Sequence, residues 1–342
     1  MHRRQPFILI IFTALFFTAA AWGCGFKKEV VLTGKTMGTN WRVKVVTGYF
    51  DTSKPLDEAI KNRLREINKS MSLYERDSEI KRLNGHRSSG KFRVSDDFMS
   101  VLLTGKQLYK ETNGAWDATI RPLVNLWGFG DAGKDYKVPG ARIIKRNLSH
   151  VSFDSIHILD GNFIVKTDPE LTLDFGSIAK GFGVDEVAGV IRSRGYSDFI
   201  VEIGGEVYAS GTRLDGKRWR IGINMPDKDS DFNDVYKVII VSGKAVATSG
   251  NYRNFFEKKE KLYSHVIDPR TGMPCDNGVV SASVIAGSCT YADGLATALM
   301  VMGHTEGVDF VDKKKGVECL VIVKEKDGSL TNYFSKNFND EG

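Results

Sequence analysis

The segment Val279–Met302 reads VVSASVIAGSCTYADGLATALMVM and indicates the fold class most clearly. It begins with an apolar run, Val279–Ala286, of the length and composition of a strand. The segment Thr290–Met302 is rich in alanine, leucine and methionine, which favours a helix, and Gly303 is a typical helix stop. A strand followed directly by an apolar helix predicts a helix packed on a sheet.

The same two kinds of element alternate along the rest of the chain. Strand pairs are predicted around tight turns at Asp160-Gly161, Asp215-Gly216 and Asp327-Gly328. Single helices lie between such pairs, one beginning at Ser53 and another over Ser95–Thr112. We therefore expect an α+β fold with largely antiparallel or mixed sheets covered by helices. Two intimately packed lobes would form a single unit over residues 32–338.

Charge and composition restrict the class of partner. The 342-residue chain has 42% apolar and 26% charged residues and a formal net charge of +6. Removal of Met1–Gly23 would take away Arg3 and Arg4 and leave +6 − 2 = +4. Basic and acidic residues alternate, and no basic stripe that could follow a nucleic-acid backbone is present in the sequence. We therefore expect no nucleic-acid partner.

The N-terminus has the pattern of an export signal. Arg3 and Arg4 precede the uncharged run Phe7–Trp22, which is shorter than the roughly 20 residues needed to cross a bilayer. The segment Ala21-Trp22-Gly23-Cys24 resembles a bacterial lipobox, whose cysteine is acylated. We expect a signal peptide over 1–23, a lipid on Cys24 and a tether over 24–31. The protein would then be anchored in the bacterial cell envelope, facing the periplasm. An ordinary signal peptide or an uncleaved anchor is the alternative.

The three other cysteines indicate no disulfide framework. Cys275, Cys289 and Cys319 are odd in number and widely spaced, and no CxxC pair suggests zinc. Cys289 and Cys319 are interpreted as small buried apolar residues, although one disulfide among the three is left open.

The first polar segment that a plain core element does not explain is Leu171–Gly181. We predict a strand over Leu171–Phe175, then Asp174 near its end and a helix from about Ser177 to Arg194. Ser177 and Lys180 would share the first helical turn, where free N–H groups and the helix dipole attract anions. The alternative is that Ser177 only caps the helix and Lys180 is solvated.

Two more segments carry groups suited to chemistry. His265 stands at the entrance of a loop made rigid by Pro269, Gly272 and Pro274, where a histidine can act as a general base. It lies in a long loop predicted over residues 249–274. Asp293 and Thr297 lie four residues apart on the predicted helix and offer hard oxygen ligands for Mg²⁺. A loop-fixing histidine and ordinary helix residues are the alternatives.

One glycine motif matches a dinucleotide-binding pattern by sequence alone. Gly128–Gly133 matches GxGxxG, but charged residues and Pro139 follow it instead of an apolar helix. We interpret it as a glycine-rich loop.

Taken together, these segments resemble the FAD:protein FMN transferase family, known as ApbE. The resemblance runs from Thr36 to about Phe334 and rests on seven segments in the family's order. They are Met37-Gly38-Thr39; Met71–Tyr74 with Asp77–Ile80; Gly114–Asp117 with Pro122–Val124 and Leu126–Gly130; Asp174–Gly181; Ser249–Tyr252; His265–Pro274; and Ala292–Thr297.

The resemblance implies an enzyme that uses Mg²⁺ and FAD. Members transfer FMN through its phosphate to a threonine or serine hydroxyl of an acceptor protein and release AMP. Some members hydrolyse FAD to FMN and AMP instead, which is the alternative activity for this chain. The acceptor would be a membrane redox subunit or an exported flavoprotein.

The resemblance also implies residue roles. Asp293, Thr297 and Ser177 would hold Mg²⁺, and Lys180 would neutralise the pyrophosphate. His265 would take the proton from the acceptor hydroxyl. The residues expected to line the FAD pocket are Met37, Tyr74, Ala115, Trp116, Asp117, Asp174, Lys180 and Ile267.

Two alternative interpretations place the chain in other classes of protein. Ser177-Ile-Ala-Lys180 fits the S-x-x-K motif of penicillin-binding serine acyl-enzymes, with Ser249–Asn251 and Arg270–Gly272 as its other elements. However, prolines place Arg270–Gly272 in a turn, where that class has a strand. A non-catalytic flavin-binding lipoprotein would need neither Asp293 nor His265.

Overall fold

The structure is a computed structural model, and it describes residues 26–130, 136–227, 234–251, 255–258 and 261–338. The expected signal peptide and Cys24 lie outside these residues, as do Tyr252 and the end of the glycine-rich loop. The strand that follows the expected tether already begins at Lys27. Residues 27–31 therefore belong to the sheet, and the predicted end of the tether at residue 31 is wrong.

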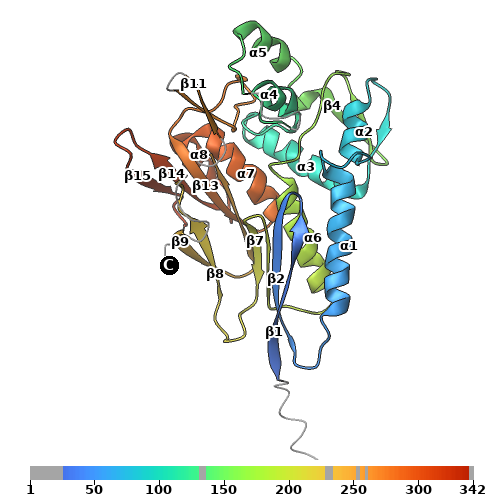
Figure 1. The fold of residues 1–342 in the computed structure, drawn as a ribbon, viewed down its shortest axis with the longest axis vertical. Helices are drawn as coiled ribbons and strands as arrows, with labels where there is room; N and C mark the ends of the chain where they lie inside the picture. Colours follow the sequence, from blue (N-terminus) through green and yellow to red (C-terminus); the bar gives the residue numbers. More distant parts are fainter. Residues whose placement is uncertain (1–25, 131–135, 228–233, 252–254, 259–260, 339–342) are drawn as a thin grey trace, which may run out of the picture.

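An eight-stranded sheet forms the centre of the fold (Figure 1). Each of its neighbouring strand pairs is antiparallel. The order is β1 (Lys27–Thr36), β2 (Thr39–Gly48), β6 (Phe199–Ile203), β7 (Glu206–Ser210), β10 (Lys244–Gly250), β13 (Val279–Ala286), β14 (Glu318–Lys324) and β15 (Leu330–Phe334). The predicted strand Val279–Ala286 is confirmed and lies inside this sheet.

Helices cover one face of the sheet and a hairpin covers the other. α6 (Ala179–Arg192) packs on β6 and β7, and α7 (Cys289–Met302) packs on β10 and β13. The hairpin β8 (Trp219–Asn224) and β9 (Val235–Val241) shares an apolar cluster with the opposite face. Figure 1 shows α1 (Lys54–Met71) beside α6, and the two helices contact each other. The predicted apolar face of α1 is buried: Leu56, Ile60, Leu64 and Ile67.

The second lobe packs against the first through a shared core. It contains α2 (Glu79–Gly85), α3 (Asp96–Glu111), η1 (Ala118–Ile120), α4 (Arg121–Leu126), α5 (Ala141–Leu148), η2 (Phe153–Ser155) and the three-stranded sheet β3 (Phe92–Arg93), β5 (Phe163–Lys166), β4 (Ile156–Leu159). Phe98 of α3 and Leu295 of α7 belong to one apolar cluster. The predicted α+β fold with antiparallel sheets covered by helices is therefore confirmed. α8 (His304–Val311) completes the described helices.

One predicted strand is wrong for a clear physical reason. Leu171, Leu173 and Phe175 are buried and alternate as in a strand, but no strand pairs with them. The amide side chain of Asn84 satisfies both the N–H and the C=O of Leu173, at 2.7 and 2.9 Å. The helix that follows begins at Ala179, so Ser177 precedes it.

The loop predicted over residues 249–274 is also partly wrong. Ser249 and Gly250 end β10, and β11 (Phe255–Lys258) pairs with β12 (Lys261–Ser264) in a small hairpin. Among the described residues of this range, Asn251 and the segment from His265 to Pro274 lie outside the strands. Cys275, Cys289 and Cys319 are free, and the last two are fully buried as predicted. Within the described part of the chain, no helix is both long and apolar enough to cross a bilayer.

Candidate functional site

Two adjoining cavities lie where α6, α7 and α4 approach one another. The first cavity, about 380 Å³, is lined by Trp116, Ser177, His265, Asp293 and Thr297, among others. The second cavity, about 280 Å³, is lined by Met37, Asn68, Met71, Tyr74 and Arg121, among others. They share the lining residues Val124, Phe129, Asp174, Gly176 and Lys180. The two cavities therefore form one continuous candidate site.

Lys180 stands between the two cavities with two acidic neighbours. Its Nζ lies 2.6 Å from Glu206 Oε1 and 3.8 Å from Asp293 Oδ1. Both acids are 2% exposed, and the other carboxylate oxygen of Glu206 accepts no hydrogen bond. Burial, together with the charge of Asp293, raises the pKa of Glu206 to about 7. Burial by itself would lower the pKa of Lys180, but the two carboxylates outweigh it and raise that pKa.

Asp293 is fixed by the helix opposite to its own. Its Oδ2 accepts a 2.9 Å hydrogen bond from the backbone N–H of Gly181, at the start of α6. In return, Asp185 of α6 accepts hydrogen bonds from Ser288 Oγ and from the backbone N–H groups of Cys289 and Thr290, at 2.7 to 2.9 Å. Asp185 thus caps the start of α7. The two helix beginnings are held in a defined register, which places Asp293 beside Lys180.

Hydroxyl groups extend the polar surface of the first cavity. Thr297 Oγ1 lies 2.8 Å from Ser249 Oγ at the end of β10. Ser177 Oγ accepts a 3.0 Å hydrogen bond from the indole N–H of Trp116. Both predicted hydroxyl ligands are therefore oriented by a partner, and both side chains line the cavity that contains Asp293.

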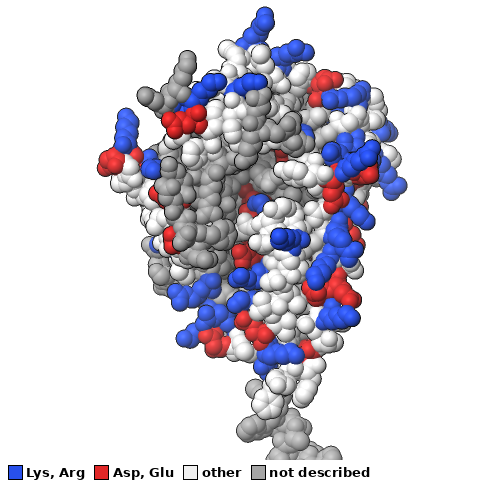
Figure 2. All heavy atoms as spheres, in the orientation of Figure 1, with Lys and Arg blue, Asp and Glu red and all other residues white. Residues whose placement is uncertain are grey.

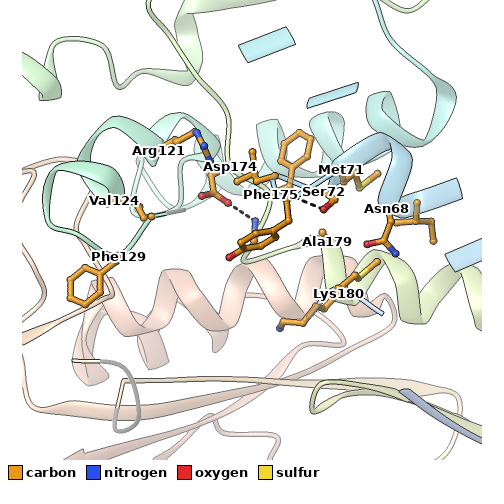
Figure 3. Close-up of a pocket in the computed structure, with 16 residues that line it drawn as sticks. Asn68, Met71, Ser72, Arg121, Val124, Phe129, Asp174, Phe175, Ala179 and Lys180 are labelled. Atoms are coloured by element: carbon orange, nitrogen blue, oxygen red, sulfur yellow. Dashed lines mark hydrogen bonds between the residues drawn. The ribbon is translucent and has the colours of Figure 1, made fainter. Parts of the chain in front are cut away.

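The second cavity is framed by the end of α1 and by the segment around α4. Figure 3 shows Asn68 and Met71 of α1 on one side, Arg121 and Val124 of α4 on the other, and Asp174 and Lys180 between them. Asp174 Oδ1 accepts a 2.7 Å hydrogen bond from the N–H of Gly176.

Two predicted pocket residues have unusual positions at the second cavity. Met37 has a positive φ of 50° in the turn between β1 and β2, which is uncommon outside glycine. Its side chain lies so close to Gly183 of α6 that a Cβ atom at position 183 would touch it. Tyr74 lines the cavity and is nevertheless 82% exposed, so its ring is accessible from solvent.

The loop that follows His265 is tied together by its own hydrogen bonds. Asp268 O accepts from the N–H of Gly272 at 2.8 Å, and Asp268 N donates to Met273 O at 2.9 Å. Trp127 Nε1 donates to Gly272 O at 2.9 Å. The rigid loop predicted from its prolines and glycine is present. His265 lines the first cavity, with its ring edge-on to Phe129 at 6.2 Å between centroids.

Asp117 lines the first cavity, but its carboxylate bonds to the protein itself. Oδ1 accepts from the backbone N–H and the hydroxyl of Thr119, and Oδ2 accepts from the N–H of Phe153. Burial raises the pKa of Asp117 to about 6, in spite of these hydrogen bonds. Asp117 therefore shapes the cavity wall through the turns that it holds.

The structure brings together all twelve candidate site residues that lie in its described part. Met37 and Tyr74 line the second cavity only. Lys180 and Asp174 line both, and the first cavity is also lined by Ala115, Trp116, Asp117, Ser177, His265, Ile267, Asp293 and Thr297.

Sequence reasoning missed Glu206, the acid that pairs with Lys180. Its signal is the run Gly204-Gly205-Glu206, in which an acid follows a tight turn and begins a buried strand. Both glycines have positive φ, at 63° and 105°. Gly181 and Ser249 were also missed as positioning groups, because their contacts are with residues far away along the chain.

The residues fit a magnesium ion with few protein ligands. No group of three or more His, Cys, Asp or Glu side chains that could enclose a metal is present in the described residues. The first cavity instead offers the carboxylate of Asp293 and the hydroxyl groups of Ser177 and Thr297 among its polar lining groups. The Lys180–Glu206–Asp293 cluster carries two carboxylates against one ammonium, so one negative charge remains when all are ionised. A divalent cation would offset it.

The S-x-x-K interpretation is not supported by this geometry. Ser177 Oγ bonds to Trp116, while Lys180 Nζ is paired with Glu206. The segment Arg270–Gly272 lies in the turn and not on a strand. A serine nucleophile activated by Lys180 is therefore absent from the described arrangement.

The fold is that of solved flavin transferases. The structure matches a flavin transferase ApbE from Vibrio cholerae with a TM-score of 0.83 and 40% identity, covering 92% of this chain and 99% of that chain. A variant of that protein with a histidine replaced by glycine matches with a TM-score of 0.81. A Pseudomonas stutzeri flavinyl transferase ApbE in its apo form matches with a TM-score of 0.82 and 34% identity, covering 91% and 95% of the two chains.

The chain belongs to the ApbE family, whose pattern matches residues 37–321. Relatives called FAD:protein FMN transferase include one from Vibrio cholerae, 42% identical over 91% of this chain and 92% of its own length. Another, from Escherichia coli, is 33% identical over 95% and 94% of the two chains. The predicted family is confirmed.

Proposed function

We propose that the chain transfers FMN from FAD to a threonine or serine hydroxyl of an acceptor protein, with Mg²⁺, and releases AMP. The acceptor oxygen attacks the phosphorus of the FMN half, and the bond from that phosphorus to the bridging oxygen breaks. The acceptor then carries FMN through a phosphoester, and AMP leaves with the bridging oxygen. The proton of the acceptor hydroxyl passes to a base.

One observation carries this proposal. Lys180 at the start of α6 and Asp293 on α7 lie side by side in the wall of one cavity, which Thr297 and Ser177 also line. Phosphoryl transfer requires charge neutralisation and in-line positioning more than covalent catalysis. A lysine, a carboxylate and two hydroxyl groups in one cavity supply groups for the first requirement.

Asp293, Thr297 and Ser177 would hold Mg²⁺ in this proposal. Bound Mg²⁺ supplies charge neutralisation on the phosphate oxygens. Lys180 neutralises the pyrophosphate from the α6 side, and Glu206 holds its ammonium in place. His265, which lines the first cavity, accepts the proton of the acceptor hydroxyl.

The second cavity would receive the isoalloxazine ring of FAD. Met37 and Tyr74 offer an apolar and an aromatic surface there, and Asn68 and Asp174 offer polar atoms for the ring edges. Because the two cavities share Lys180 and Asp174, the flavin and the pyrophosphate can be bound at the same time.

Hydrolysis of FAD to FMN and AMP is the second candidate activity. It differs only in the attacking group, because water replaces the acceptor hydroxyl. The exposed Tyr74 shows that the second cavity is open to solvent, which is the observation that favours this alternative.

We also propose that residues 1–23 are a signal peptide and that a lipid on Cys24 anchors the chain to a membrane of the cell envelope, facing the periplasm. The sequence pattern supports both. The acceptor would then be a membrane redox subunit or an exported flavoprotein, which an anchored enzyme can reach.

The test is to incubate the purified chain with FAD, Mg²⁺ and a candidate acceptor, and to weigh the acceptor by mass spectrometry. Transfer increases its mass by that of FMN minus water, and the increase disappears when the target hydroxyl is replaced by alanine. If FAD is consumed and the acceptor mass stays constant, the activity is hydrolysis.

A further inference from the structure

An exposed aromatic surface lies at the end of the molecule where the described chain begins. Phe26, Tyr49 and Phe50 are 83%, 58% and 93% exposed. Phe50 is the most exposed large apolar side chain in the described residues. We call these three residues the aromatic foot. Figure 1 places the start of β1 at the lower end of the molecule, away from α4, α5 and α7.

The foot is an ordered part of the fold. Tyr49 N donates a 2.7 Å hydrogen bond to Phe26 O and thereby continues the β1–β2 ladder by one pair. The rings of Tyr49 and Phe50 meet edge-to-face at 5.4 Å between centroids. The loop that follows is braced, since Asp51 Oδ2 accepts from Gly48 N and Asp51 O accepts from Lys28 Nζ. The aromatic rings are thus held outward by a rigid turn.

Basic side chains surround the foot. Lys27 and Lys54 are exposed beside it, Lys28 lies over the Tyr49 ring, and Arg194 is at the end of α6. Tyr196, two residues later, reaches Asp51, which brings the end of α6 to this surface. The acids nearby include Asp51, Asp198 and, at the start of α1 beside Lys54, Asp57 and Glu58. Asp198 pairs with Lys27, and Asp57 pairs with Lys61. Basic groups therefore lie beside the foot with acids interspersed.

Figure 2 shows Lys and Arg side chains, interspersed with Asp and Glu, close to an uncharged surface at this lower end. Aromatic rings flanked by lysine and arginine are characteristic of surfaces at a membrane interface, where rings enter the headgroup layer and cations contact anionic lipids.

The short chain between Cys24 and the aromatic foot indicates which kind of partner covers the foot. Only two steps along the backbone separate Cys24 from Phe26, a reach of about 7 Å at most. A lipid on Cys24 would therefore keep Phe26 within about 7 Å of the membrane surface. A partner protein or a second copy would have to fit into that gap, whereas a bilayer already fills it.

We propose that the aromatic foot inserts into the headgroup layer of an anionic bilayer and fixes the orientation of the anchored chain. The proposal rests on the lipid anchor proposed for Cys24 and is independent of the transfer chemistry. The geometry then sets the height of the active cavities. β1 runs from the foot at Phe26 to the turn at Met37, a path of about 36 Å at 3.3 Å per residue. With β1 along the membrane normal, Met37 and the second cavity would stand about 36 Å above the bilayer.

The test uses the full chain, processed and lipidated in cells and reconstituted into phosphatidylethanolamine–phosphatidylglycerol vesicles. Phe50→Trp adds a reporter at the foot, and Leu262→Trp adds a matched exposed reporter on β12, since Leu262 is 58% exposed. Lipids brominated near the headgroup quench tryptophan that inserts. The emission added at position 50 should fall by about half or more, and that added at position 262 should be unchanged. The wild-type chain supplies the background of the other tryptophans.

Each outcome decides a separate point. Equal quenching at positions 50 and 262 in vesicle-bound protein overturns the proposed insertion of the aromatic foot and leaves the proposed lipid anchor unaffected. Failure of the wild-type chain to float with vesicles overturns both the anchor and the foot. Neither result affects the proposed FMN transfer, which is measured on the same preparation with FAD and an acceptor. Replacement of Phe26 and Phe50 by serine supplies a second check, since quenching of a Tyr49→Trp reporter should then be lost.

Discussion

The backbone N–H of Gly181 donates a 2.9 Å hydrogen bond to Asp293 Oδ2 and so joins the start of α6 to the middle of α7. This contact requires glycine. A Cβ at position 181 would lie 2.3 Å from the carbonyl oxygen of Cys289 and 2.8 Å from Asp293 Cβ. The close approach of the two helices, and with it the position of Asp293 beside Lys180, depends on the missing side chain.

Gly181→Ala should therefore separate the helices and misplace Asp293. We expect a loss of about 1 to 3 kcal/mol in the free energy of unfolding and a large loss of FAD cleavage. Gly189→Ala is the matched control in the same helix, because nothing lies within 4 Å of a Cβ there. That variant should gain about 0.5 to 1 kcal/mol from helix propensity. Urea unfolding measures the stability of each variant, and AMP release measures its FAD cleavage. Equal stability and equal cleavage rates in the two variants would refute the packing argument.

Asp293→Ala tests the proposed magnesium site directly. Removal of the carboxylate should reduce FAD cleavage by about a hundredfold or more, because the phosphates lose their main source of charge neutralisation. It also leaves the Gly181 N–H without an acceptor, at a cost of about 1 to 3 kcal/mol in stability, so the fold should persist. Asp276→Ala, at an exposed aspartate with a 74% accessible side chain, is the control. If the Asp293 variant cleaves FAD at the wild-type rate without added metal, the assignment of Asp293 as a magnesium ligand is wrong.

Much of the fold follows from local pattern. The strand Val279–Ala286 and the face of α1 are given by apolar periodicity, and the hairpin turns β4–β5 and β14–β15 are given by Asp160-Gly161 and Asp327-Gly328. The strand pair expected around Asp215-Gly216 is wrong, because this turn joins β7 and β8, which belong to two different sheets. The strand expected at Leu171–Phe175 failed because Asn84 pairs with its backbone, 89 residues away along the chain. No local signal reports such a partner. The hairpin β11–β12 was missed for another reason. Its strands have four residues each, which is too short to show an alternating apolar pattern clearly.

The candidate site shows the same division. Residues that belong to recognisable motifs, such as Lys180 and Asp293, could be proposed from the sequence and do lie together. Glu206 could not, because its function is defined by the Lys180 ammonium that it contacts. The sequence gives no measure of burial at a single acid, and burial is what makes Glu206 unusual.

His265→Ala separates proton transfer from binding. The variant should bind FAD with nearly wild-type affinity, since other residues line the second cavity, while transfer to an acceptor falls by about 10² to 10⁴-fold. Added imidazole should restore part of the rate, because it can enter the space left by the ring. His157→Ala, at an exposed position on β4, should change neither quantity. Flavin fluorescence reports binding and the mass of the acceptor reports transfer; unchanged transfer would exclude His265 as the base.

The buried acid Glu206 makes a prediction about pH. Burial raises its pKa in the folded chain to about 7 from an ordinary value of 4.5, so the folded state binds a proton more tightly than the unfolded state. The stabilisation from this proton is complete below about pH 4.5 and is lost as the pH rises through about 7. In EDTA, the wild-type chain should therefore lose up to about 3 kcal/mol of unfolding free energy between pH 5 and pH 8 through this group.

Glu206→Gln removes the titrating group and keeps the shape of the side chain. Urea unfolding of this variant in EDTA should show a flatter stability profile from pH 5 to pH 8 than the wild-type chain. Excess Mg²⁺ should flatten the wild-type profile as well, because a cation near Asp293 and Glu206 favours the ionised carboxylate and competes with the proton. A variant that retains the full wild-type pH dependence would show that the titration belongs to another group. A wild-type profile insensitive to Mg²⁺ would place the cation away from the Lys180–Glu206–Asp293 cluster.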